Sequence, residues 1–349
     1  MGYRRQYMKW FFAAVAIMAA AGLTGCAWLN APAEGVGGVE EAGSDFQAGA
    51  DIDYLKQANV SIASGASGGN YYMVGTALAQ TIQKYDPALI CSSETTGGTG
   101  ENIALISSGA TTIGMGMADD IASAYEGKRD YEGSPADNLR AICAGAKNTF
   151  HVIVMADSDI YSLSDLKGKK ISLGPAGAPY FSPSLLESVA GLVIGQDYQG
   201  QYLGHDQAAD ALSDGDVDAL IACLSFPASA YSNLAFTKEV RFIGLSQEEM
   251  ETALEKNQTW LYNTIPAGTY QGQDEDILSP AVPVWLFTHE GVGEDIIYRV
   301  CKVIFENVDE LGQIAIDAGY YNVDTALDSI VIPIHPGAAR YFEEAKRNK

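Results

Sequence analysis

Two glycine-rich segments, about thirty residues apart, stand where helices are expected to begin. The first, residues 64–72, follows the apolar run Asn59–Ala63, which is typical of a strand, and precedes apolar residues at helical spacing. The second, residues 95–102, follows another strand-like run and precedes a short predicted helix at 102–108. Glycine lets a ligand approach the backbone, and the free N–H groups at the positive end of a helix dipole favour an anionic oxygen. The sequence therefore predicts two helix N-termini that can bind an anionic group.

A third turn of the same kind occurs in the second half of the chain. Gly174-Pro175-Ala176-Gly177 follows the strand-like run 170–173 and precedes a predicted helix around 183–187. Ligands of α/β proteins bind outside the carboxyl ends of the strands, so we expect all three turns to face one cleft between two lobes. Aromatic residues near the turns are candidate walls of this cleft: Tyr71, Tyr72, Tyr180, Phe181, Phe226 and Tyr231.

Strand and helix patterns alternate along the body of the chain, which favours parallel sheets with helices on both faces, an α/β fold. Residues 140–146 and 150–156 read as two consecutive strands, and residues 294–311 read as one long amphipathic helix. We expect the hinge between the lobes in the crossover segments near Thr149–Ala156 and Val282–Thr288.

The first residues predict export. Arg4, Arg5 and Lys9 precede an apolar run that is too short to span a bilayer comfortably, as in a secretory signal. The run ends in Leu23-Thr24-Gly25-Cys26, which resembles a bacterial lipobox, so residues 1–25 are expected to be cleaved and Cys26 to carry palmitate or a similar lipid. Residues 26–57 are expected to form a flexible tether. The predicted location is the outer face of the cytoplasmic membrane, or the periplasm.

Charge and cysteine usage exclude several classes of protein. The net charge of −23, which becomes −26 without residues 1–25, and the lack of a Lys/Arg cluster argue against nucleic acid as a partner. The spacing of the other cysteines matches no zinc site, and we interpret them as buried thiols in the core: Cys91, Cys143, Cys223 and Cys301. No sequence motif calls for a cofactor or a metal. Arginine is scarce, and Arg140 is the arginine nearest to a strand end in the first lobe, so an anionic group is expected to be held mainly by helix N-termini and hydroxyls.

The chain from Asn59 to Phe342 resembles the TAXI family of TRAP-transporter-associated extracytoplasmic solute-binding proteins. The segments that carry this resemblance keep their order and spacing: 64–75, 95–109, 162–177, 208–219, 264–270 and 334–341. The resemblance implies a two-lobed periplasmic-binding-protein fold of type II, with residues 58–150 and about 288–349 in one lobe and 151–287 in the other. It further implies a receptor, not an enzyme, that closes on a small organic solute such as glutamate, an oxo-acid or another carboxylate and delivers it to TRAP membrane permease subunits.

The resemblance also assigns candidate ligand-binding residues. In the first lobe these are Ser67, Gly68, Gly69, Asn70 and Tyr71, then Thr96, Gly97, Gly98, Thr99 and Asn102, and finally Asp119. In the second lobe they are Gly174, Pro175, Gly177, Ala178, Tyr180 and Phe181. Family members usually carry hydroxyl-bearing residues after the third turn, whereas this chain has Ala178-Pro179-Tyr180-Phe181, which indicates a less polar pocket on that side.

Three alternatives fit parts of the sequence. Gly65-Ala66-Ser67-Gly68-Gly69 matches the G-x-S-x-G elbow of a secreted serine hydrolase, with His335 late in the chain as a candidate base behind Asp324 or Asp328. A structural surface lipoprotein would explain the tether and the acidity but not the glycine turns. A solute sensor for a signalling partner would use the same fold and the same cleft.

Overall fold

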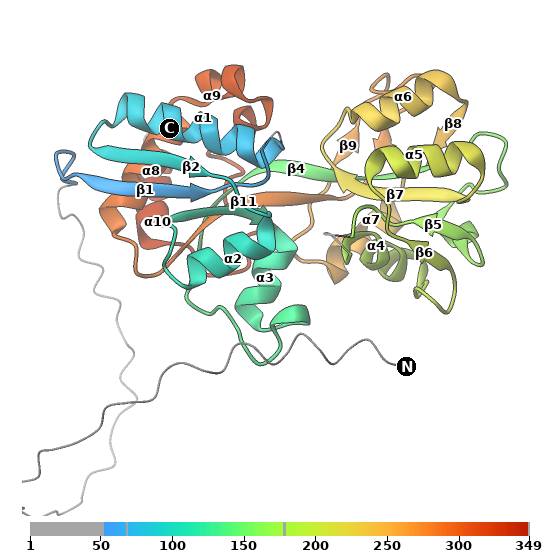
Figure 1. Ribbon diagram of the computed structural model, residues 1–349, viewed down its shortest axis with the longest axis horizontal. Coiled ribbons are helices and arrows are strands. Elements are labelled where there is room, and N and C mark those ends of the chain that lie inside the picture. Colours follow the sequence, from blue (N-terminus) through green and yellow to red (C-terminus); the bar gives the residue numbers. More distant parts are fainter. Residues whose placement is uncertain (1–51, 68, 177–178, 348–349) are drawn as a thin grey trace, which may run out of the picture. The chain divides into compact units, whose positions relative to one another are not determined.

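A nine-stranded mixed sheet runs through the part of the chain that the structure, a computed structural model, describes: residues 52–67, 69–176 and 179–347 (Figure 1). The strand order is β2-β1-β3-β11-β4-β7-β5-β6, with β8 also paired to β4, and β9 and β10 form a separate hairpin pair. The strands are β1 (Ala58–Ala63), β2 (Leu89–Glu94), β3 (Ile113–Met117), β4 (Leu139–Met155), β5 (Lys170–Ser172), β6 (Gln199–Gln201), β7 (Ala219–Leu224), β8 (Val240–Phe242), β9 (Thr264–Ile265), β10 (Ile277–Leu278) and β11 (Ala281–His289). The α-helices are α1 (Asn70–Tyr85), α2 (Thr99–Ser107), α3 (Ala118–Glu126), α4 (Phe181–Ala190), α5 (His205–Asp214), α6 (Ser229–Thr237), α7 (Gln247–Lys256), α8 (Glu294–Glu306), α9 (Val308–Ile314) and α10 (Pro336–Arg347). Short 3₁₀ helices are η1 (Arg129–Tyr131), η2 (Leu163–Leu166) and η3 (Ile316–Tyr320).

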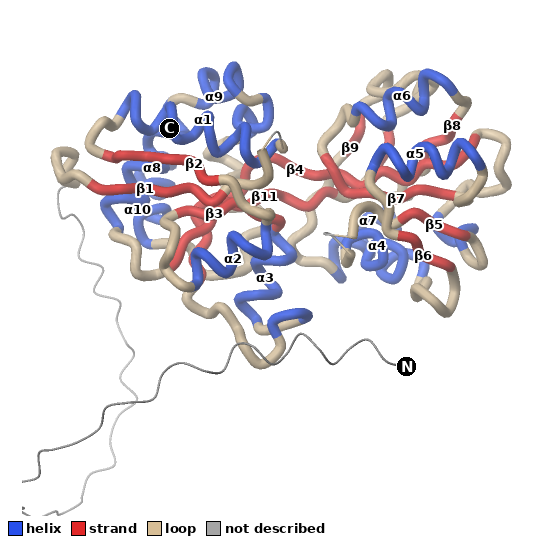
Figure 2. The backbone as a smooth tube through the Cα atoms, in the orientation of Figure 1, coloured by secondary structure: helices blue, strands red, loops and turns tan. Residues whose placement is uncertain are grey.

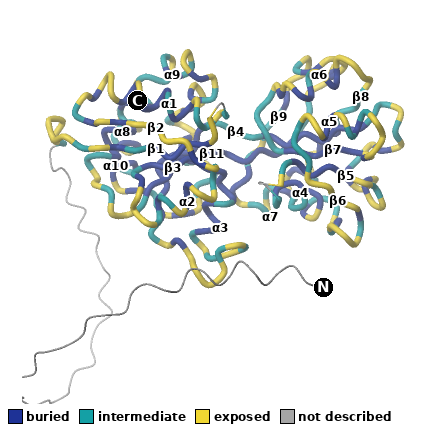
Figure 3. Tube along the Cα trace, viewed as in Figure 1, coloured by how far each residue is buried: buried dark blue, intermediate teal, exposed yellow. Residues whose placement is uncertain are grey.

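The two-lobed α/β fold predicted from the sequence is confirmed, but one sheet is shared by the two lobes, where separate sheets were expected. In the first lobe β2, β1 and β3 are parallel, and α1, α2, α3, α8 and α10 lie around them (Figure 2). In the second lobe β6, β5 and β7 are parallel, and α4 to α7 lie around them. Buried residues follow the central strands through both lobes, with exposed residues mainly on the outer helices and loops (Figure 3).

Strand β4 belongs to both lobes. It pairs antiparallel with β11 from Leu139 to Thr149 and with β7 from Thr149 to Val154, so its hydrogen-bonding partner changes at Thr149. The sequence predicted two consecutive strands here, and this was wrong: Lys147 and Asn148, although polar, stay extended because they pair with Pro283 and Val282 of β11. The change of partner lies at the start of the first predicted hinge segment, and the lobe boundaries drawn from the sequence remain a prediction.

The helix predicted over 294–311 is two helices. Helix α8 ends at Glu306, and α9 begins at Val308. Asn307 between them has φ −131°, and its side-chain Nδ2 donates to the carbonyl of Val303. Asparagine bonds to nearby backbone groups in this way and so favours helix ends over helix interiors.

The end of the predicted tether is attached to the first lobe. Arg299 of α8, which is fully buried, donates to the carbonyl oxygens of Asp53, Tyr54 and Lys56 and forms a bidentate ion pair with Asp86. The predicted signal peptide, Cys26 and the tether up to residue 51 lie outside the described residues. Within the described residues, no helix combines the length and apolar character needed to cross a membrane.

Three of the four cysteines of the body match the sequence interpretation of buried core thiols, and Cys223 does not. Cys91, Cys143 and Cys301 are buried and Cys223 is half-buried, and all four are free. Burial raises the pKa of the Cys91 thiol to about 12 and that of Cys143 well above its usual range. These thiols therefore stay protonated and unreactive at neutral pH.

Candidate functional site

A cavity of about 680 Å³ lies between the two lobes. This volume is in the range of sites that enclose small organic ligands. The first lobe supplies residues at the starts of α1 and α2 and at the end of β3. The second lobe supplies residues at the starts of α4, α5 and α6. Asn148 of β4, the strand that belongs to both lobes, completes the lining. The lining residues are Gly65, Ala66, Gly69, Asn70, Tyr71, Gly98, Met117, Asn148, Phe181, His205, Asp206, Cys223, Leu224, Ser225, Pro227, Ala228, Ser229 and Ala230.

Four of these helices begin without a side-chain cap. The residues at the N-cap positions of α1, α2, α4 and α6 are Gly69, Gly98, Tyr180 and Ala228, and none accepts a backbone N–H through its side chain. The first N–H groups of a helix have no partner inside the helix and carry its partial positive charge. Uncapped helix starts from both lobes thus surround one cavity, an arrangement that suits an anionic group.

Five of the predicted ligand-binding residues line this cavity: Gly69, Asn70, Tyr71, Gly98 and Phe181. A smaller adjoining cavity of about 200 Å³ is lined by Gly97, Thr99, Tyr180 and again Phe181. The first two glycine turns and the segment after the third turn therefore come together at the lobe interface. Gly68, Gly177 and Ala178 lie outside the described residues.

Thr96 and Asn102 are buried and hold the second turn in place. The Asn102 amide donates to the carbonyls of Ser64 (2.8 Å) and Met115 (2.7 Å), and the Thr96 hydroxyl donates to the Asn102 carboxamide oxygen (2.7 Å). These bonds join the ends of β1 and β3 to the start of α2. Both residues position the cleft wall without lining either cavity.

Asp119 likewise lines neither cavity. Its carboxylate, which is buried, accepts hydrogen bonds from the Thr259 hydroxyl and from Nε1 of Trp260 (3.1 Å). Thr259 and Trp260 follow α7 of the second lobe, so this carboxylate connects the lobes. Ser67 is exposed, and neither Ser67 nor Gly174-Pro175 is among the residues that line the two cavities.

Arg129, which the sequence did not single out, lies at the lobe interface. Its guanidinium lies 3.7 Å from the carboxylates of Asp119 and Asp120 and 5.0 Å from the centre of the Tyr180 ring, and Nη1 is buried without a hydrogen bond. Arg129 has φ +54°, a strained value that is associated with functional sites. Burial, outweighing the nearby arginine, raises the pKa of Asp120 to about 6. Arg140 instead pairs with Glu290.

At the start of α6, the sequence predicted only Phe226 and Tyr231 as candidate cleft walls and assigned no ligand-binding residue. Ser225 and Pro227 to Ala230 follow β7 directly and line the cavity, but this turn contains no glycine, so a search for glycine turns passed over it. The signal that could have found it is a proline and a serine between an apolar strand and a helical pattern. Asn148 was missed because it lies in the middle of a strand; its side chain bonds to Ser225 Oγ (3.2 Å) across the floor of the cleft.

The hydrolase alternative finds no support at His335. Both ring nitrogens are engaged: Nε2 lies 3.0 Å from the Val292 carbonyl, and Nδ1 accepts from the Gly337 N–H (3.2 Å). His335 is also buried, whereas Ser67 is exposed. Among the described residues no group of His, Cys, Asp or Glu is arranged to hold a metal ion.

Fold and cleft define the class of protein: a two-lobed α/β protein with the periplasmic-binding-protein fold. A protein described as the periplasmic sulfonate-binding protein SsuA of Methylobacillus flagellatus KT has this fold, with a TM-score of 0.52, 14% identity, and coverage of 83% of this chain and 96% of that chain. The periplasmic aliphatic sulphonate binding protein SsuA of Escherichia coli matches with a TM-score of 0.49, 18% identity, and coverage of 82% and 78%. A protein of Bacillus subtilis, ytmK, described as an amino-acid ABC transporter extracellular-binding protein, matches with a TM-score of 0.47, 14% identity, and coverage of 76% and 99%.

Within this class, the chain belongs to the NMT1-like family, which matches residues 62–345. The match covers the whole two-lobed body. It does not single out the TAXI family, which the sequence resemblance favours.

Proposed function

We propose that this protein is an extracytoplasmic solute receptor that captures a small organic anion or an amino-acid-like solute by closing its two lobes. The family and the fold support the class of receptor, and the resemblance to TAXI proteins supports delivery of the solute to TRAP permease subunits. The lipobox-like sequence before Cys26 supports an exported protein held at the membrane by a lipid.

The observation that carries this proposal is the set of uncapped helix starts around the interlobe cavity. A carboxylate, sulfonate or similar group can accept hydrogen bonds from the free N–H groups of α1 and α2 in one lobe and of α4 and α6 in the other. Such a group interacts with both lobes only when the cleft is closed, and a ligand shifts a conformational equilibrium by its differential affinity for the two states.

The acidic residue Asp206 narrows the choice of solute. It lies in the first turn of α5 and lines the same cavity. A solute with an ammonium group as well as a carboxylate could place the carboxylate at the uncapped helix starts and the ammonium at Asp206. This arrangement favours an amino-acid-like solute over a dianion, and the apolar side chain of Phe181 favours a solute with a hydrocarbon portion.

A thermal-shift screen with amino acids, oxo-acids, dicarboxylates, aromatic carboxylates, sulfonates and sugars tests the proposal. A ligand at about a hundred times its dissociation constant stabilises the native state by about 2.7 kcal/mol, which raises the melting temperature measurably. A response limited to carboxylates, sulfonates or amino acids supports it, whereas tight binding only of cations or sugars contradicts it.

A pair of variants at the N-cap of α6 tests the role of the helix starts. Both Ala228→Asp and Ala228→Asn place a side-chain acceptor where it can cap the helix, but only the aspartate adds a negative charge to the cavity. We expect Ala228→Asp to weaken binding of the anionic solute at least tenfold more than Ala228→Asn does. Equal affinities in the two variants would show that the anionic group does not lie at this helix start.

A further inference from the structure

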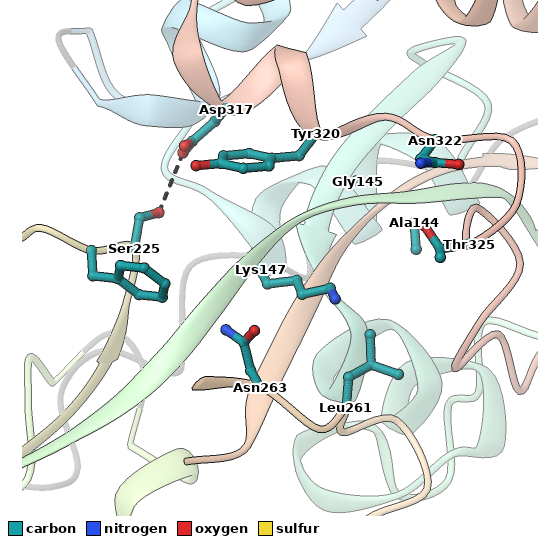
Figure 4. Close-up of a pocket in the computed structure, with 11 residues that line it drawn as sticks. Ala144, Gly145, Lys147, Ser225, Leu261, Asn263, Asp317, Tyr320, Asn322 and Thr325 are labelled. Carbon is teal, nitrogen blue, oxygen red and sulfur yellow. Dashed lines mark hydrogen bonds between the residues drawn. The ribbon is translucent and has the colours of Figure 1, made fainter. Parts of the chain in front are cut away.

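A second cavity, of about 280 Å³, lies beside the crossover strand β4 (Figure 4). Its walls come from both lobes: η3 and the following loop in the first, and the segments after β7 and before β9 in the second. The lining residues are Ala144, Gly145, Lys147, Ser225, Phe226, Leu261, Asn263, Asp317, Tyr320, Asn322 and Thr325. We call it the rear cavity.

The rear cavity and the interlobe cleft lie on opposite faces of β4. Asn148 lines the cleft and its neighbour Lys147 lines the rear cavity, and successive side chains of a strand point to opposite faces. Ser225, at the end of β7, contributes to both. A ligand in the rear cavity is therefore distinct from the solute proposed for the cleft.

Lys147, an exposed residue, brings to the rear cavity a positive charge that has no direct partner among the described residues. Its side chain extends from β4 toward Leu261 (Figure 4), and no hydrogen bond or ion pair holds its ammonium group within the described part of the chain. Nδ2 of Asn263 donates to Thr149 Oγ1 (2.7 Å), so the Asn263 amide is fixed in another part of the cavity wall. An unpaired ammonium in a concave, two-lobed wall can bind a carboxylate.

Asp317, which lines another part of the same cavity, limits what else the ligand can carry. Its Oδ2 accepts hydrogen bonds from Asn70 Nδ2 (3.1 Å) and Ser225 Oγ (3.3 Å). These two bonds hold Oδ2 on the side of the carboxylate that faces the cleft. The carboxylate still repels a second negative charge placed in the cavity. The remaining walls include the apolar side chains of Phe226, Leu261 and Ala144, which accept a hydrocarbon portion.

We propose that the rear cavity is a second binding site, for a small organic monocarboxylate whose carboxylate pairs with Lys147 and whose hydrocarbon portion packs against Phe226 and Leu261. The walls of this site belong to both lobes, and Asp317 in one wall bonds to Asn70 at the cleft. An occupant of the rear cavity would therefore contact both of the lobes that move when the cleft closes. The site does not depend on the solute of the cleft.

Ligand-observed NMR of the full chain with butanoate and with benzoate tests this site. The variant Ala66→Trp fills the cleft from an exposed position and removes the first site as a source of signal. In this background we expect both probes to bind at millimolar concentrations. Lys147→Met should weaken their binding at least tenfold, and Lys147→Arg should preserve it.

Lys170→Met is the matched control, because Lys170 is also exposed but lines neither cavity. It should bind the probes as its Ala66→Trp parent does. The proposal is overturned if neither probe binds in the Ala66→Trp background, or if Lys147→Met and Lys170→Met bind them equally. A failure of the cleft proposal gives a different result. In that case none of the solutes in the thermal-shift screen raises the melting temperature of the wild-type protein through a site that Ala66→Trp blocks.

Discussion

At the scale of single residues, His151 links the buried core of the second lobe to the cleft. Nδ1 lies 2.9 Å from the Thr149 carbonyl, Nε2 lies 2.8 Å from the Tyr270 hydroxyl, and that hydroxyl accepts from the N–H of Ala228 (2.9 Å). These contacts fit a neutral imidazole that donates from Nδ1 and accepts from Tyr270 at Nε2. The ring thus supports Ala228, the N-cap of α6 in the cleft wall.

The stability of the protein should depend on pH through this histidine. Burial lowers the pKa of His151 to about 4, so between about pH 6.5 and pH 4 the unfolded chain binds a proton that the native state does not. The stabilisation is therefore complete above pH 6.5 and is lost as the pH falls toward 4, by about 3 kcal/mol in the limit. Chemical denaturation at a series of pH values measures this loss.

His151→Gln should lower stability at pH 7 and flatten the pH dependence between 6.5 and 4. His289→Gln, which changes a half-buried histidine outside this chain of hydrogen bonds, is the control for the loss of a histidine side chain in general. An unchanged slope in His151→Gln would mean that the acid sensitivity comes from other groups.

At the scale of elements, the contact between α8 and α10 requires a glycine. A Cβ at Gly337 would lie 2.2 Å from the Glu294 carbonyl oxygen and 2.8 Å from the Tyr298 nitrogen, both backbone atoms at the start of α8. Backbone atoms cannot rotate away, so Gly337→Ala should push the helices apart and destabilise the protein by about 1–3 kcal/mol or more. The free energy of unfolding from denaturant titration measures this.

Gly100→Ala is the control for this helix contact. Gly100 lies in α2, and a Cβ there would meet nothing within 4 Å. Alanine favours a helix over glycine, so this variant should be neutral or more stable by about 0.5–1 kcal/mol. A destabilisation equal to that of Gly337→Ala would attribute the effect to glycine replacement in general, not to the close approach of α8 and α10.

The elements also show how far the sequence alone could predict the site. The glycine turns before α1 and α2 were predicted because a glycine turn between a strand and a helix has a local signature, and both turns line the cleft, although α2 begins at Thr99 and not at Asn102. The start of α6 has no such signature, and the continuity of β4 depends on pairing with β7 and β11, which are distant in sequence. Asn102 was assigned to the ligand, yet its amide is used by Ser64 and Met115, a pairing that a single sequence cannot reveal.

At the scale of the whole molecule, a few polar contacts join the lobes around the cleft. Asp119 accepts from Thr259 and Trp260, Tyr180 donates to Asp130 (2.8 Å), and Asp317 accepts from Ser225. Each bond pairs a residue of one lobe with a residue of the other. Their combined effect is to favour the lobe arrangement described here, and the loss of one should shift the equilibrium toward a more open arrangement.

Asp119 distinguishes a contact between lobes from a contact with the solute. If Asp119 joins the two lobes, Asp119→Asn and Thr259→Val should both open the cleft. Both variants should then increase the radius of gyration of the unliganded protein in small-angle scattering. Both should also weaken solute binding by a similar factor, because the binding-competent arrangement is less populated. If Asp119 instead contacts the solute, as the sequence resemblance implies, Asp119→Asn should weaken binding without changing the unliganded radius, and Thr259→Val should leave affinity unchanged. The bond from Nε1 of Trp260 to Asp119 adds a second readout. If the lobes open, Trp260 moves away from Asp119, so Thr259→Val, which leaves both of these residues in place, should alter the tryptophan fluorescence. If Asp119 contacts the solute instead, Thr259→Val should leave the fluorescence unchanged.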